Sequence, residues 1–260
     1  MDIGTLVGFV LAFIGIVIGQ ILEGGSIGQL TQPTAFLIVM GGTTGAVMIS
    51  FPLKTFLAAM KDIKNVFFDK AHKPDELVQE LLRLANKARK DGIVSLEQDI
   101  PKISDNFLRE ALRMAVDGID PKEMRATLEL RIEQIEEHLE HSPKVFEAFG
   151  GYSPTIGIIG AVLGLIQVMQ NLNDITAVGH GIAVAFVATI YGVAFANVVF
   201  LPASTKLKLK GKHEITTKLA CLDAVASIVE GMNPRLIEAK LRSYFVGELA
   251  PEEEGARKAA

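Results

Sequence analysis

Positive charge is missing from two long stretches of this 260-residue chain. Residues 1–53 and 148–205 contain no Lys or Arg, although the chain has 26 of these residues in all. Acidic residues are also scarce there, with only Asp2, Glu23 and Asp174. Since roughly a quarter of the residues in an average water-soluble domain are charged, an ordinary domain of that kind is excluded over these stretches. The pattern indicates segments embedded in a membrane.

Cysteine and the aromatic residues are scarce as well. The single cysteine, Cys221, excludes a disulfide framework and a metal site built on cysteines. Tryptophan is absent and only three tyrosines occur, so the aromatic belt that marks the ends of membrane helices is weak. What the chain does have is apolar length, because 49% of its residues are hydrophobic and its charges are concentrated in two blocks.

Four apolar stretches are long enough to cross a bilayer, which takes roughly 20 helical residues at about 1.5 Å each. We expect these spans near residues 3–22, 33–52, 150–172 and 179–202. Basic residues crowd one side of all four spans, so both termini and the central segment are predicted to be cytoplasmic. The first span is expected to stay in the membrane, because no basic residue precedes it and it is longer than the core of a signal peptide.

The predicted fold is all-α, a polytopic membrane protein with a helical cytoplasmic domain. Transmembrane helices 1 and 2 occupy residues 1–53, and transmembrane helices 3 and 4 occupy residues 148–205. The cytoplasmic helical domain covers residues 54–147, and residues 206–260 form a C-terminal cytoplasmic helix with a tail. From Pro251 onward the tail is charged and is predicted to be disordered.

Helix signals are clear in the cytoplasmic part. Pro74 opens one amphipathic run, and a second covers residues 107–116. A third begins at Asp120-Pro-Lys-Glu123, which combines an N-cap, a proline at the first helical position and a capping-box glutamate. His138 and His141 stand among glutamates, but this pattern is typical of an acidic helix surface, so we predict no metal site.

The third and fourth spans carry small residues on one face each. These are Ser153, Gly157, Ala161 and Gly164 in the third span, and Ala185, Thr189, Gly192 and Ala196 in the fourth. Small faces let membrane helices approach closely, within one chain or between copies. Thr155 and Thr189 lie on or beside these faces, so their hydroxyls either line a water-filled path or only bond to their own helices.

No Asp, Glu, Lys or Arg falls inside any predicted span. Membrane proton relays rest on ionisable side chains buried in the helix bundle. If the chain takes part in proton movement, the titrating carboxylate must therefore come from another polypeptide, whose helix packs against the small faces. Pro154 and Pro202 lie near the cytoplasmic ends of spans three and four, where they either mark helix ends or act as hinges.

Signatures of catalysis are lacking. Residues 41–45 are glycine-rich but have no phosphate-loop lysine, and no serine, histidine and aspartate arrangement is present. We expect no enzyme activity, no catalytic residue, no cofactor and no nucleic-acid partner.

Three motifs, taken in order, give the chain a resemblance to the MotA family of flagellar motor stator proteins over roughly residues 1–246. They are Arg89 with Gly92-Ile-Val-Ser-Leu-Glu97, then Tyr152-Ser-Pro-Thr-Ile-Gly157, then Ala183-Val-Ala-Phe-Val-Ala-Thr-Ile-Tyr-Gly192 leading to Leu201-Pro202. The related ExbB and TolQ proteins, which energise an outer-membrane transport system, are the nearest alternative. They usually have three spans with a different split, and a secondary transporter would usually have more spans in paired repeats.

The resemblance implies a ring of five copies in the bacterial inner membrane around two single-span partners of the MotB type. Each partner would supply a membrane aspartate that binds the travelling ion. Thr155 and Thr189 would lie near that ion, while spans one and two would face lipid. Arg89 and Glu97 match the positions that engage the rotor protein FliG. The prolines at 154 and 202 match those tied to torque generation.

The position seven residues after the proline of span three bears on which ion is carried. Sodium-using members of the family tend to have threonine there, whereas this chain has Ala161. Sodium needs oxygen ligands to replace its hydration shell, but a proton can be taken up by the partner carboxylate through water. Because Ala161 offers no oxygen, protons are expected, and sodium is the less favoured ion.

Overall fold

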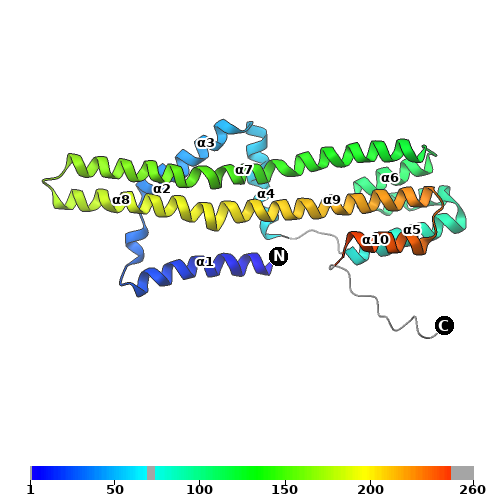
Figure 1. Cartoon of the computed structure of the whole chain (residues 1–260), viewed down its shortest axis with the longest axis horizontal. Coiled ribbons are helices and arrows are strands. Elements are labelled where there is room, and N and C mark those ends of the chain that lie inside the picture. The colour runs from blue at the N-terminus through cyan, green and yellow to red at the C-terminus, as the bar shows by residue number, and fades with distance from the viewer. Residues whose placement is uncertain (1, 69–73, 247–260) are drawn as a thin grey trace. The chain divides into compact units, whose positions relative to one another are not determined.

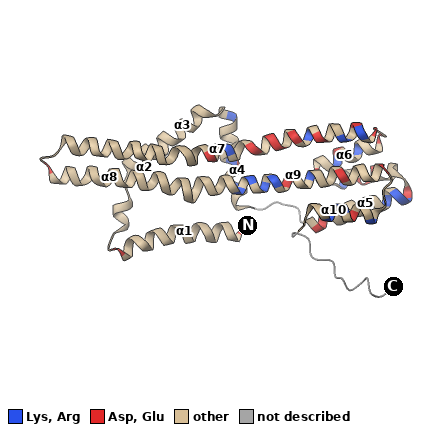
Figure 2. Cartoon of the chain, in the orientation of Figure 1, with Lys and Arg blue, Asp and Glu red and all other residues tan. Residues whose placement is uncertain are grey.

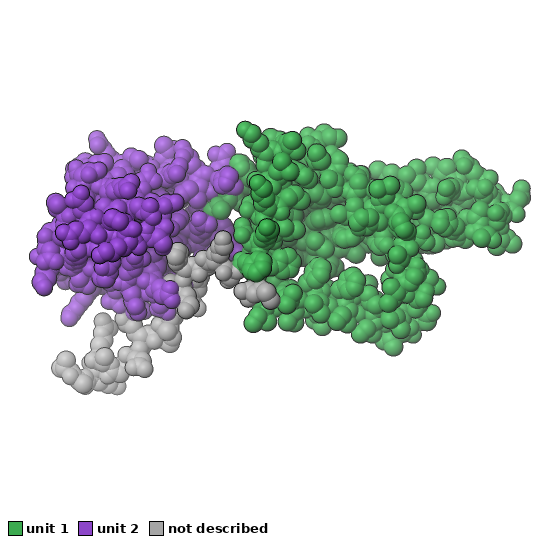
Figure 3. Space-filling view, turned by 180° about the vertical axis from the view of Figure 1, so that it is seen from behind, with its two compact units in different colours: residues 1–70, 139–209 green, residues 71–138, 210–260 purple. Residues whose placement is uncertain are grey.

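The computed structural model describes residues 2–68 and 74–246, and over these ranges the chain is helical with no β-strand. The predicted disordered tail from Pro251 lies outside the described residues. The chain forms two compact units, coloured separately in Figure 3. We call residues 1–70 with 139–209 the membrane unit, and residues 71–138 with 210–260 the charged unit.

Two long helices contribute residues to both units. They are α7, Pro121–Gln170, and α9, Leu201–Val229. The remaining segments of the membrane unit are α1 Ile3–Leu22, η1 Ile27–Leu30, α2 Pro33–Phe36, η2 Leu37–Gly41, α3 Gly42–Ser50, α4 Leu53–Phe67, α8 Ile175–Ala194 and η5 Phe195–Phe200. Figure 1 shows α7 and α8 running side by side.

Among the described residues, four helical stretches are long and apolar enough to cross a membrane. Two of them are Ile3–Leu22 and Ile27–Ser50, and the other two lie within Pro121–Gln170 and Ile175–Val229. Figure 2 shows α1, α2 and α8 free of blue and red, while charged residues lie on α4, α5, α6, α10 and one end each of α7 and α9. The third and fourth spans are therefore parts of much longer helices.

The second span is not one regular helix. It passes from α2 through the π-helical turn η2 into α3, and its residues Ala35 and Val39 are buried against Val184, Val187 and Ala188 of α8. By contrast, α1 has no buried residue. The second span is thus packed on α8, whereas α1 offers its apolar side chains to the surroundings.

Aromatic residues form a cluster in the membrane unit. Phe149 stacks on Phe200 at a ring-centre distance of 4.8 Å, and Phe56 and Phe146 lie at 6.2 and 6.4 Å from Phe149. Because aromatic rings bury large areas, the cluster joins α4, α7 and η5 firmly. Ser204 adds a hydrogen bond of 2.9 Å to the carbonyl oxygen of Pro143.

The charged unit has an ordinary hydrophobic core. Its own segments are α5 Pro74–Asp91, η3 Ile93–Gln98, η4 Ile100–Lys102, α6 Asn106–Val116 and α10 Pro234–Tyr244. They close over fully buried leucines, among them Leu81, Leu84, Leu108, Leu112 and Leu128. Helix α5 begins at Pro74 and α7 at Pro121, as the proline and capping signals predict.

Candidate functional site

Helices α7 and α8 approach each other backbone to backbone. A methyl group placed on Gly192 would lie 2.6 Å from the backbone oxygen of Ser153, and one placed on Gly164 would lie 2.7 Å from that of Gly181. A methyl group on Gly157 would meet the backbone oxygen of Ala188 at 2.9 Å. No side chain larger than glycine fits at these points without moving a helix.

The small faces of the third and fourth spans therefore pack against each other. Ser153, Gly157 and Gly164 meet Ala185 and Gly192 within one chain, which is the intrachain alternative of the sequence analysis. Three further members of this contact were missed in the sequence: Gly160, Gly181 and Ala188. Their small size was the available signal, but it could not show which face of each helix is covered.

Thr189 and Pro154 border this crossing on the side away from the second span. Val187 of α8 is buried against the second span, and Thr189 follows two residues later, which is roughly 200° around a helix. On α7, a methyl group on Gly42 would lie 2.8 Å from Ile156, and Pro154 precedes Ile156 by two residues. The same rotation therefore turns Pro154 and Thr189 to the same side of the helix pair.

Ala161 lies on that side too, because it follows Pro154 by seven residues, or nearly two helical turns. Thr155 does not. It stands two residues before Gly157, which faces α8, so Thr155 points away from α8 and is exposed. The two threonines predicted to lie near an ion thus belong to different faces within one chain. Residues Pro154, Ala161 and Thr189 are called the open flank below.

Both threonine hydroxyls donate to carbonyl oxygens of their own helices. Thr155 donates to Tyr152 at 2.8 Å, and Thr189 donates to Ala185 at 3.2 Å. Their oxygen lone pairs stay available as acceptors. The hydroxyl of Ser153, which is fully buried at the crossing, makes no hydrogen bond within the described part of the chain.

Neither proline ends a helix. Pro154 lies inside α7, and Pro202 is the second residue of α9, which continues directly from η5. Proline lacks the amide hydrogen and its ring crowds the carbonyl one turn earlier. The wide π-helical turn η5, just before Pro202, is a known way for a helix to absorb such a defect. The helix-end alternative for both prolines is therefore wrong.

The surroundings of the two prolines touch each other. Pro154 leaves the carbonyl of Gly150 without its usual helical donor. A methyl group on Gly150 would lie 2.4 Å from the side chain of Leu201, the residue before Pro202. Glycine at position 150 is what allows Leu201 to pack this close to the weakened turn of α7.

The predicted rotor-contact residues Arg89 and Glu97 lie in the charged unit. Arg89 is in the last turn of α5 and Glu97 is in the short 3-10 helix η3 that follows Gly92. Gly92 has a φ of +83°, which favours glycine and lets the chain reverse between the two segments. Both charged side chains are exposed, and neither forms a salt bridge within the described residues.

A hollow of about 660 Å³ in the charged unit is bordered by Arg89. Most of its other walls are apolar, including Ala88, Ile93, Ile119 and Met232. An exposed cation beside an apolar depression is a common arrangement at protein–protein contacts.

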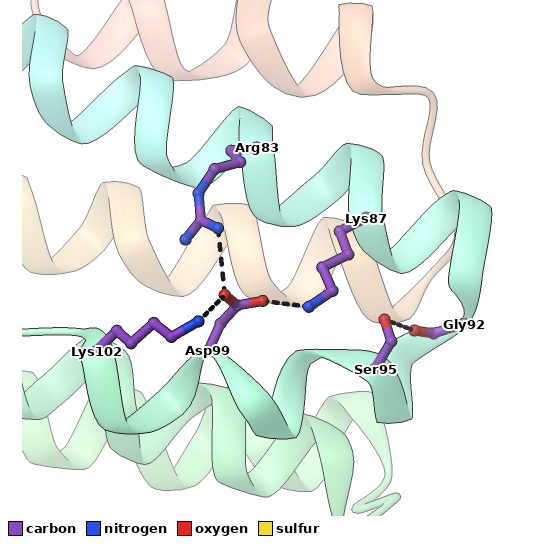
Figure 4. A network of polar contacts seen from close by, with 6 residues as sticks. All are labelled: Arg83, Lys87, Gly92, Ser95, Asp99 and Lys102. Atoms are coloured by element: carbon purple, nitrogen blue, oxygen red, sulfur yellow. Dashed lines mark hydrogen bonds and ion pairs between the residues drawn. The ribbon is translucent and has the colours of Figure 1, made fainter.

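A buried carboxylate connects the two segments that carry Arg89 and Glu97 (Figure 4). Asp99 is 2% exposed, and it accepts hydrogen bonds from Lys87 at 2.6 Å and Arg83 at 3.2 Å. The Lys102 ammonium lies 3.8 Å away. The hydrogen bond from Lys87 is the main cause that lowers the pKa of Asp99, while burial opposes it. The carboxyl is thus ionised at neutral pH.

Two more carboxylates of this unit are held by cations. Burial alone would raise the pKa of Asp105, but hydrogen bonds from Lys218, at 2.5 Å, and from the Leu108 amide bring it below its usual value. The same competition lowers the pKa of Asp223, whose hydrogen-bond donors include Tyr244, at 2.8 Å, and Arg125, at 3.0 Å.

No site for metal or thiol chemistry is present among the described residues. There, no three His, Cys, Asp or Glu side chains are placed to hold a metal ion. Cys221 is fully buried in the charged unit, and burial raises the pKa of its thiol to about 12, so it stays protonated.

Four apolar spans, a backbone-close pair of small-residue helices without Asp, Glu, Lys or Arg in their spans, and a charged helical unit define a class: a multi-pass membrane subunit. Within that class the family is specific. Residues 99–219 match the model of the MotA/TolQ/ExbB proton channel family, and residues 6–92 match the motility protein A N-terminal model. The second match covers most of the first two spans.

Relatives and solved structures agree over nearly the whole length. Motility protein A of Aquifex aeolicus is 37% identical over 255 residues, which are 97% of this chain and 100% of that protein. The structure of C. jejuni MotAB superposes with a TM-score of 0.91 at 36% identity, covering 98% of each chain. The flagellar MotAB stator complex from Bacillus subtilis gives 0.87 at 33% identity, covering 99% of this chain and 100% of that one.

The chain belongs to the MotA/TolQ/ExbB proton channel family and, within it, to the motility protein A branch. It is a stator-type channel subunit of a flagellar motor. The match of the N-terminal model sets aside the alternative of an ExbB or TolQ protein.

Proposed function

We propose that this protein conducts ions only together with a single-span partner of the MotB type, which supplies the aspartate that takes up the ion. The single observation that carries this proposal is that the spans hold no Asp, Glu, Lys or Arg. A proton path across a bilayer needs a titratable group within the membrane, and the one histidine of the spans, His180, lies at the very end of the fourth, so we assign that group to another polypeptide. The solved relatives are complexes named MotAB, which supports a partner of this kind.

The partner helix packs on the open flank of Pro154, Ala161 and Thr189. The small faces are already occupied by each other, and α2 with η2 covers the opposite side of α8. Five copies in a ring around two partner helices would turn this flank toward the axis and α1 toward lipid. Thr155 then lies a quarter turn further round α7, on the side of the next copy.

Protons are the ion of this channel. The open flank carries one hydroxyl, on Thr189, and the alanine at position 161 adds no oxygen ligand for sodium. The test is swimming and ion flux in sodium-free medium, compared with Ala161→Thr. The wild type should swim and conduct without sodium, and loss of both in sodium-free medium would reverse the assignment.

Torque reaches the rotor protein FliG through Arg89 and Glu97 at the surface of the charged unit, and both termini and this unit lie in the cytoplasm. The exposed charges and the neighbouring apolar hollow support this contact. Pro154 and Pro202 provide the deformable turns through which ion uptake changes the shape of the helix pair.

The experiment is co-purification with the candidate partner, a count of the copies in the complex, and proton flux in vesicles with and without the partner. Flux should appear only with the partner, and it should vanish when the partner's membrane aspartate is replaced by asparagine. Flux from the isolated chain that the partner does not increase would overturn the proposal. For the rotor contact, Arg89→Glu should stop swimming while leaving proton flux unchanged.

A further inference from the structure

One ion pair ties together the two segments that carry Arg89 and Glu97. Lys87 precedes Arg89 by two residues on α5, and Asp99 follows Glu97 by two residues at the end of η3. The Lys87 ammonium and the Asp99 carboxylate are 2.6 Å apart. Each proposed rotor-contact residue thus stands two residues from one end of the same ion pair.

The turn that carries Glu97 is anchored on both sides. Leu96 is fully buried in the core, and Asp99 is 2% exposed. At its beginning, Ser95 bonds to the carbonyl oxygen of Gly92 at 2.6 Å through its hydroxyl, and at 3.1 Å through its amide. A short 3-10 segment makes few bonds of its own, so its position depends on such anchors.

We propose that Asp99 is a positioning residue for torque generation: its carboxylate, shared by Lys87 and Arg83, fixes η3 against α5 and thereby sets the spacing of Glu97 and Arg89 that the rotor reads. This inference rests on the rotor contact proposed above. Figure 4 shows the three side chains meeting between the two segments.

The geometry separates this role from simple stability. The cations around Asp99 reach water, because the side chains of Arg83, Lys87 and Lys102 are 54%, 27% and 74% exposed. When the carboxylate charge is removed, these cations are hydrated and are not stranded in the core. What is lost is the ionic connection between α5 and η3, while Leu96 stays in the core.

The matched control is the ion pair of Asp105 and Lys218 in the same unit. It is equally short, at 2.5 Å, and its lysine is more buried, at 11% side-chain exposure. Asp105 caps α6 through the amide of Leu108, and asparagine caps helices equally well. Asp105→Asn therefore removes an ion pair of similar length and keeps the cap, at a place that carries neither Arg89 nor Glu97. Because Lys218 is less hydrated than Lys87, the control should cost at least as much stability as Asp99→Asn.

The experiment measures the torque increment per stator from stepwise speed changes of a bead on the flagellum, with stator recruitment and proton flux followed separately. Asp99→Asn and Lys87→Met should each lower the increment severalfold, with flux unchanged. Lys87→Arg, which keeps the positive charge, should retain the wild-type torque increment, and Asp105→Asn should leave the increment unchanged. Because the first two variants shift the net charge in opposite directions, a common loss indicates position and not the electrostatic field.

Spacing is also measured directly on the full-length chain with spin labels at Lys90→Cys and Gln98→Cys, in a Cys221→Ala background. The distribution of distances between the two spin labels should broaden in Asp99→Asn and not in Asp105→Asn. Normal torque together with an unchanged distance distribution in Asp99→Asn would overturn the inference. Equal losses of torque in Asp99→Asn and Asp105→Asn would also overturn it. So would torque changes of opposite sign in Asp99→Asn and Lys87→Met. If Arg89→Glu and Glu97→Lys both keep normal torque, the rotor contact itself fails. If they lose torque while Asp99→Asn does not, only the positioning role fails.

Discussion

The membrane unit and the charged unit are both helical, but opposite kinds of residue hold them together. In the membrane unit the closest contacts occur at glycines, whose lack of a side chain lets α7 and α8 meet backbone to backbone. In the charged unit, leucines fill a core and buried carboxylates bind cations around it. The difference follows from the surroundings. Burying a leucine away from water lowers the free energy, whereas burying it away from lipid, which is equally apolar, gains nothing from the hydrophobic effect.

This comparison also separates the proposed tasks. The spans of the membrane unit hold no Asp, Glu, Lys or Arg and leave the ion-binding charge to a partner, so they can surround a moving ion without trapping it. The charged unit uses ionised groups as fixed connectors, and it leaves Arg89 and Glu97 exposed. The kind of substitution that is most damaging in one unit should therefore have a smaller effect when it is made in the other unit.

Removing volume should do most damage in the charged unit. Leu128→Ala removes a fully buried side chain, which typically costs about 2–5 kcal/mol of unfolding free energy through lost burial and the cavity left behind. We expect much less full-length protein and rapid proteolysis of this unit. Leu130→Ala on the same helix, where the side chain is 57% exposed, is the control and should behave like wild type. Equal protease resistance of the two variants would contradict the prediction.

Adding volume should do most damage in the membrane unit. Gly192→Ala places a methyl group 2.6 Å from the backbone oxygen of Ser153, and overpacking of this kind costs about 1–3 kcal/mol. We expect the yield of partner-bound complex in detergent to fall by about tenfold, with loss of swimming. Gly151→Ala is the control, because no atom lies within 4 Å of a methyl group there. A normal yield for Gly192→Ala would show that α7 and α8 tolerate separation.

Acid should weaken the charged unit more than the contact between α7 and α8. The pKa of Asp99, Asp105 and Asp223 is lowered in the folded chain, so the unfolded chain binds more protons than the folded one just below the usual aspartate pKa of 3.8. The stability from these ion pairs is fully present above that pH and is lost as the pH falls through the lower folded values. Hydrogen exchange on full-length protein should show constant protection of this unit between neutral pH and about pH 5, then a decline that does not extend to α8. Equal loss of protection in α8 would refute the contrast.

The smallest effect is expected at the open flank. Thr189→Val keeps the side-chain shape and removes the oxygen that accepts from a neighbour, since the hydroxyl hydrogen already bonds to Ala185. Assembly should be unchanged and proton flux should fall by less than about tenfold. Thr205→Val serves as control, because Thr205 makes the same kind of bond, at 3.0 Å to Leu201, beyond the predicted span. Unaltered flux in Thr189→Val would remove Thr189 from the ion path.

Most of the fold could be predicted from the order of residues. Hydropathy, the missing lysines and arginines, and the start signals at Pro74 and Asp120 act over short distances along the chain, so they were visible without a structure. The continuity of α7 through Pro154 was not visible, because proline ends a helix or is tolerated within it depending on packing that sequence does not show. The Gly150–Leu201 contact, 51 positions apart, belongs to the same category.

For the candidate site, the sequence by itself determined which residue types are present: small residues and hydroxyls in the spans, no acid to bind a proton, and the charges Arg89 and Glu97 beside a glycine. Only the tertiary structure decided which faces of α7 and α8 cover each other, that Thr155 and Thr189 point to different sides, and that Asp99 joins α5 to η3. The physical reason is that composition and hydropathy are properties of each segment alone, whereas the direction of a side chain has meaning only once its neighbours in space are fixed.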